Sequence, residues 1–195
     1  MQRSDSKFRL TLLSVINAAL ILACVAGCVY ILISGSGLYY SVSAAAELLA
    51  LVFSVMYYLR GYKKDAAKYF RMFMLFYACT YIAETLATVL GYDDLGVISD
   101  VSESVVFSMI LFGNTLVLAL GKDLGKRVSY TLCLINAAFY ALPIIGLFIP
   151  GMINFETEQI KAASIILYCT WFVLSLNAFI MTVAKYKDKA ARGSE

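Results

Sequence analysis

Six apolar stretches divide this sequence, and each is long enough to cross about 30 Å of hydrocarbon as a helix. Hydrophobic residues make up 62% of the chain, whereas roughly half of the residues are apolar in a water-soluble globule. The sequence therefore predicts an all-α, polytopic membrane protein in which residues 1–195 form a single transmembrane domain. The expected transmembrane helices are 10–33, 39–59, 72–91, 101–121, 128–149 and 161–184.

The basic residues mark every second connection between these stretches. They gather in the N-terminus, in segments 60–71 and 122–127, and in the tail 185–192. The other three connections contain a single basic residue, Lys161. Positively charged connections normally stay in the cytoplasm. We therefore expect six helices in the inner or plasma membrane, with both termini on the cytoplasmic side.

The sequence contains a weak internal repeat and, near its start, a similarity to a processing site. Residues 13–27 resemble residues 132–146, and 62–68 resemble 186–192. A parallel repeat of helical hairpins is one interpretation, and chance similarity between apolar segments is the other. The run ending in "VAGC" at Cys28 is similar to a bacterial lipoprotein cleavage site, but the apolar run continues beyond it. We expect an uncleaved first helix.

Two acidic residues, Glu47 and Glu84, lie inside expected membrane helices. Each is about 13 residues from the basic end of its helix, which places both roughly 20 Å from the cytoplasmic edge. An ionised carboxylate inside a membrane span costs at least about 2.5–3.5 kcal/mol. The pair could be protonated and structural, could bind a cation, or could open to a wet outer vestibule.

The helix faces around these acids are polar or small at helical spacing. We expect a pocket between the second and third helices that binds an ion or another ligand, and its predicted residues are Glu47, Glu84, Tyr77, Tyr81, Thr80 and Ser54. Four further acids near its outer mouth form either a solvated loop or a funnel for cations. These are Asp93, Asp94, Asp100 and Glu103.

Amides and thiols complete the set of polar groups in the apolar stretches. Four asparagines lie about 12 Å from the cytoplasmic edge, where we expect them to hydrogen-bond across helices; the alternative is the floor of a polar cavity. They are Asn17, Asn114, Asn136 and Asn177.

We expect the five cysteines to be small packing residues without disulfides. The chain contains no histidine, and no metal or cofactor site is expected.

The sequence predicts a transporter or a ligand-binding membrane subunit whose carboxylate-lined pocket takes a cation or a proton-coupled substrate. The alternative is an accessory or sensory membrane protein that acts on a membrane or cytoplasmic protein partner through its basic loops. We do not expect an enzyme, because the usual nucleophile–base and metal arrangements are absent from the sequence. The lipid bilayer is an expected partner, and nucleic acid is not.

Overall fold

The computed structural model describes the backbone of residues 2–60, 66–89, 101–121, 124–149 and 157–192. Side chains are described over residues 15–59, 67–83, 85–86, 105–121, 124–146, 148–149 and 157–186. Within these ranges the secondary structure consists of six α-helices. They are α1 (Gln2–Ser34), α2 (Leu38–Arg60), α3 (Ala66–Val89), α4 (Val101–Leu120), α5 (Lys126–Leu147) and α6 (Glu158–Arg192).

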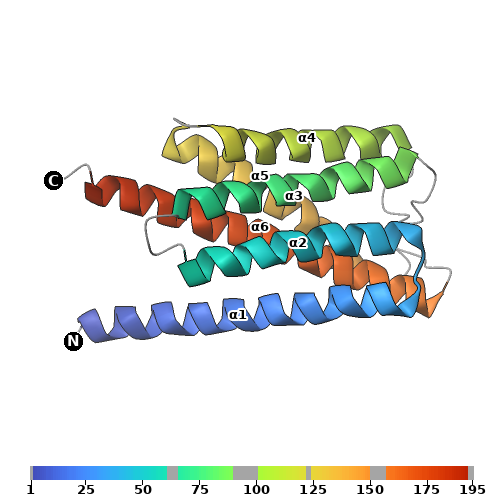
Figure 1. Ribbon diagram of the computed structural model, residues 1–195, viewed down its shortest axis with the longest axis horizontal. Helices are drawn as coiled ribbons and strands as arrows, with labels where there is room; N and C mark the ends of the chain where they lie inside the picture. Colours follow the sequence, from blue (N-terminus) through green and yellow to red (C-terminus); the bar gives the residue numbers. More distant parts are fainter. Residues whose placement is uncertain (1, 61–65, 90–100, 122–123, 150–156, 193–195) are drawn as a thin grey trace.

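The helices run in alternating directions along one long axis, and both termini lie at the same end of the molecule (Figure 1). Each helix packs against the next one in the chain, and α6 returns to contact α1, α2 and α3 as well as α5. In the apolar segment of α6, 61% of the residues are buried inside the protein, whereas 28% are buried in the apolar segments of α1 and α5. Helix α6 is therefore the most buried of these segments, and it contacts every other helix except α4.

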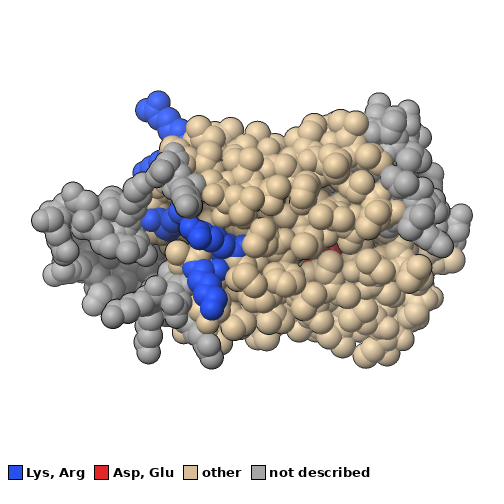
Figure 2. Space-filling model, turned by 45° about the horizontal axis from the view of Figure 1, so that its top comes forward, with Lys and Arg blue, Asp and Glu red and all other residues tan. Residues whose placement is uncertain are grey.

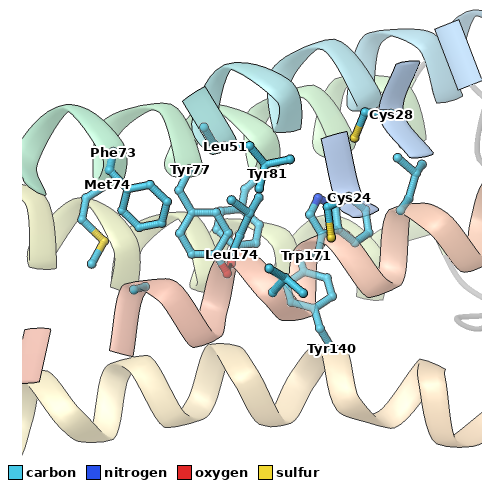
Figure 3. Packing of buried hydrophobic residues seen from close by; sticks show 14 of the residues in the cluster. Cys24, Cys28, Leu51, Phe73, Met74, Tyr77, Tyr81, Tyr140, Trp171 and Leu174 are labelled. Carbon is cyan, nitrogen blue, oxygen red and sulfur yellow. Dashed lines mark hydrogen bonds between the residues drawn. The ribbon is translucent and has the colours of Figure 1, made fainter. Parts of the chain in front are cut away.

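Aromatic side chains from three helices fill the centre of the bundle (Figure 3). The rings of Tyr77 and Tyr81 in α3 lie 5.1 Å apart, and Tyr81 stacks on Tyr140 of α5 at 6.0 Å. Trp171 of α6 lies 4.8 Å from Tyr140, and Tyr168 is the next ring along α6. All five are buried, so this aromatic cluster is part of the core.

The outer surface of the bundle is apolar. Large aliphatic and aromatic side chains on the outward faces of α1, α2, α4 and α5 are exposed. Exposure of so many apolar side chains is unfavourable in water and favourable among lipid tails. Among the described residues, four helical segments have the length and composition to cross a membrane, and α4 contributes a shorter apolar segment, Val105–Leu120. The four are Val15–Ser34, Leu38–Leu59, Lys126–Gly146 and Glu158–Tyr186.

The all-α fold is therefore confirmed, and every predicted helix coincides with an observed one. The observed α1, α3 and α6 also extend beyond the apolar stretches into basic sequence, where Lys and Arg are good helix formers. The count of six membrane crossings, the cytoplasmic termini and the hairpin repeat stay predictions.

A tight turn joins α1 to α2 at the end of the bundle opposite the termini (Figure 1). Gly35 and Gly37 have φ values of +68° and +110°, a conformation that residues with a side chain rarely adopt. Gln159, at the start of α6, donates a hydrogen bond to the Ser34 carbonyl at 2.8 Å. The turn therefore holds α1, α2 and α6 together.

Helices α1 and α6 approach closely at Gly27. A methyl group at this position would come within 2.6 Å of Ile166 Cγ2, so Gly27→Ala must push the two helices apart or displace a β-branched side chain. We expect Gly27→Ala to lower the free energy of unfolding by about 1–3 kcal/mol, measured by thermal or denaturant unfolding in detergent.

Gly113→Ala in α4 is the matched control, because a methyl group there would meet nothing within 4 Å. It should be neutral or stabilise the helix by about 0.5–1 kcal/mol. Equal effects of the two substitutions would contradict the close α1–α6 contact.

Candidate functional site

Glu47 lies inside α2, and it is completely buried (0% exposed). The Cys28 thiol of α1 lies 3.7 Å from Glu47 Oε2 and donates a hydrogen bond to it. The same sulfur lies 4.0 Å from the Thr170 hydroxyl of α6, which donates to the Ile166 carbonyl at 2.8 Å. The carboxyl group of α2 is therefore linked to α1 through the Cys28 thiol, and this thiol also reaches the Thr170 hydroxyl of α6.

The polar stripe of α2 faces this junction. Ser43 precedes Glu47 by one helical turn and Ser54 follows by two, and both are buried. Residues on the opposite side of the helix, such as Leu49 and Val52, are exposed. The polar face of α2 is therefore directed into the bundle.

Glu84, the predicted partner of Glu47, lies within α3, but its side chain lies outside the described residues. The pairing of the two acids stays a prediction. The acids of the predicted outer mouth, Asp93, Asp94, Asp100 and Glu103, also lie outside the described side chains.

Asn177 of α6 is the centre of one hydrogen-bond network. Its side-chain oxygen accepts from Asn17 of α1 at 3.0 Å and, from α2, from Ser54 at 3.3 Å and Tyr58 at 2.7 Å. Its amide nitrogen donates to the Val173 carbonyl at 2.8 Å. One buried amide therefore joins α1, α2 and α6.

Asn136 of α5 is the centre of a second network on the other side of the bundle. Its amide nitrogen donates to Thr115 of α4 at 2.9 Å and to the Tyr81 hydroxyl of α3 at 3.3 Å. Its oxygen accepts from Asn114 of α4 at 3.3 Å. This second amide joins α3, α4 and α5.

The Tyr81 hydroxyl extends the second network towards α6. It donates to the Tyr77 hydroxyl at 2.6 Å, which in turn bonds to Ser175 of α6. Thr80 is buried beside them, and its hydroxyl donates to the Tyr77 carbonyl of its own helix at 2.7 Å. Thr80 therefore contributes to helix α3 and not to a contact between helices.

These contacts place the predicted site residues in separate groups. Glu47 contacts α1 through Cys28, Ser54 belongs to the Asn177 network, and the two tyrosines belong to the Asn136 network. The prediction that asparagines bond across helices is confirmed. Their arrangement is two pairs, Asn17–Asn177 and Asn114–Asn136.

Sequence reasoning missed the thiol and hydroxyl groups that surround Glu47. We expected Cys28 to be a packing residue, and it is buried as expected, but it also meets the carboxylate. All five cysteines are free thiols. The sequence positions of the two residues could have predicted this contact. Cys28 and Glu47 lie on consecutive antiparallel helices on either side of a short turn, so their depths are similar.

Two polar groups near this junction have hydrogen-bonding capacity left within the described part of the chain. The Ser43 hydroxyl and the Trp171 indole N–H are buried without a hydrogen-bond partner there. Ser43 lies one turn from Glu47, and Trp171 directly follows Thr170. The same described residues contain no cluster of three His, Cys, Asp or Glu side chains arranged to hold a metal ion.

Comparison with known proteins returned no matching family model, no similar curated protein and no similar solved structure. Fold and site therefore define the class of this protein directly. It is an all-helical protein with helices that could cross a membrane and with a carboxyl group enclosed among them.

The Asn177 network yields a prediction about stability. Asn177→Ala removes the acceptor of three hydrogen bonds in a buried site, and we expect it to lower the free energy of unfolding by about 1–3 kcal/mol. Asn114→Ala, which removes one bond at a half-buried position, should cost about 0.6 kcal/mol. Unfolding in mixed detergent micelles measures both, and an equal loss would contradict the central position of Asn177.

Proposed function

We propose that this chain is a small integral membrane protein with six transmembrane helices and cytoplasmic termini, and that it binds or transports a cation or a proton-coupled substrate at Glu47. The observation that carries the proposal is the complete burial of this carboxyl group, in contact with the Cys28 thiol of α1 that also reaches Thr170 of α6. Acidic groups inside membrane helices are costly and usually mark ion pathways or proton relays.

The charge distribution supports the proposed orientation. Described Lys and Arg side chains from α3, α5 and α6 gather at the end where both termini lie (Figure 2). Lys161 lies near the start of α6, at the opposite end, and pairs with Glu158 at 3.4 Å. A basic end of this kind is normally cytoplasmic.

The groups around Glu47 suit the exchange of a proton for a cation. When a cation binds, the carboxyl group releases its proton and the cation takes its place; the reverse step restores the protonated acid. The Cys28 thiol, which contacts the carboxyl group, also reaches the Thr170 hydroxyl, and the Ser43 hydroxyl, one helical turn from Glu47, has capacity for a further bond. In this proposal Glu84 of α3 is a second carboxylate on the path.

The experiment measures proton release from the purified protein in lightly buffered detergent solution as single cations are added. The probes are sodium, potassium, methylammonium and tetraphenylphosphonium. We expect at least one of them to release protons in proportion to the protein, and Glu47→Gln to abolish the release because an amide has no proton to exchange.

Glu158→Gln is the matched control, since the same substitution is made at an exposed, ion-paired acid. It should behave as the wild type does. The proposal would be contradicted if no probe releases protons from the wild type, or if Glu47→Gln releases as many protons as the wild type does. Loss of folding in Glu47→Gln with no release from the wild type would indicate a structural role for the acid.

The alternative function is an accessory or sensory membrane protein, and the basic end of the bundle is the observation that favours it. A soluble acidic partner could dock there. Purification from native membranes discriminates between the two, because the alternative requires a stoichiometric protein partner and the transport proposal does not.

A further inference from the structure

The helix ends at the basic side of the bundle bring cations together from three helices. The described ones are Lys68 and Arg71 of α3, Lys126 and Arg127 of α5, and Lys185 of α6. We name them the basic rim. All but Lys185 are exposed, and Lys185 is half-buried. Of the acids whose side chains are described, Glu47 is in the core and Glu158 is at the far end.

Aromatic contacts show that the three helix ends form one layer. The Lys185 ammonium group lies 5.0 Å from the ring centre of Phe70 in α3, next to Arg71. It also lies 6.0 Å from the ring of Tyr186. Tyr186 hydrogen-bonds to Ser129 of α5 at 2.8 Å and to the Leu124 carbonyl.

The α5 cations join the same layer through Tyr130. Lys126 lies 5.6 Å from the centre of that ring, and Tyr130 packs edge-on against Tyr186 at 6.1 Å. The rings of Phe70, Tyr130 and Tyr186 thus form an aromatic floor across the ends of α3, α5 and α6, and Lys126 and Lys185 lie against it.

This layer lies where the apolar stretches of the helices end. Lys126 begins α5 ahead of its apolar stretch, and Lys185 and Tyr186 follow the apolar stretch of α6. Cations and tyrosines at this level face lipid headgroups in a membrane, and basic surfaces between transmembrane helix ends bind anionic headgroups. The position favours a lipid over a soluble protein, whose docking site would extend beyond the membrane surface.

We propose that the basic rim binds the headgroup of an anionic phospholipid, with the phosphate between the ends of α3, α5 and α6. Lys126 and Arg127 supply charge from one side, and Lys68 and Arg71 supply it from the other. The aromatic floor packs against the glycerol region of the lipid.

The test compares phosphatidylglycerol with phosphatidylcholine, by native mass spectrometry of the full chain in detergent. The wild type should retain phosphatidylglycerol preferentially. The double variant Lys126→Gln/Arg127→Gln should bind it about 30-fold more weakly, at roughly five-fold for each cation removed. Lys68→Gln/Arg71→Gln, on a different helix, should show a loss of similar size.

Lys161→Gln is the matched control, because it removes a cation at the opposite end of α6; its affinity should stay within about two-fold of the wild type. Thermal unfolding verifies that each variant is folded. Equal binding of both lipids, unchanged binding in both double variants, or an equal loss in Lys161→Gln would overturn the proposal. Displacement of the lipid by millimolar inorganic phosphate, or preferential capture of an acidic peptide, would overturn it in favour of those ligands.

Discussion

The absence of water from a hydrocarbon layer is the constraint on which this structure depends. A polar side chain in a membrane helix must find its partner inside the protein. In this chain many of these partners are found along α6, where Asn177 bonds to α1 and α2, Ser175 to α3 and Thr170 to α1. The buried polar residues of α6 are therefore satisfied by three neighbouring helices.

The same constraint links the Glu47 site to the packing of the bundle. Gly27, at the closest approach of α1 to α6, precedes Cys28 in the sequence, and Cys28 contacts Glu47. The tight contact therefore closes the side of the site that α1 covers. In the proposed function, access to the carboxyl group requires α1 to move away from α6, while the amide network around Asn177 holds the three helices together nearer the basic end.

The sequence predicted the helices and their inward faces well, because apolar length and helical periodicity are local properties. It also predicted cross-helix bonds between asparagines, since depth can be counted from the basic ends. It predicted that α2 and α3 are neighbours, which is observed, but it did not predict the position of α6 against α1, α2 and α3, because depth does not determine neighbours around the bundle. The described hydrogen bonds of Glu47 and Ser54 lead to α1 and α6, and the predicted pocket with α3 stays a prediction. The role of Cys28 was missed because a thiol among apolar residues is normally a packing residue.

The native cysteines provide the most direct measurement of the central claim that the polar faces are enclosed within the bundle. Cys79 and Cys169 lie on the exposed surface, whereas Cys28 and Cys133 are buried. The folded protein is treated in detergent with a small uncharged maleimide, and modification at each cysteine is followed by mass spectrometry. The account predicts that Cys79 and Cys169 react first and that Cys28 reacts fully only after denaturation. Reaction of Cys28 as fast as Cys79 would contradict it.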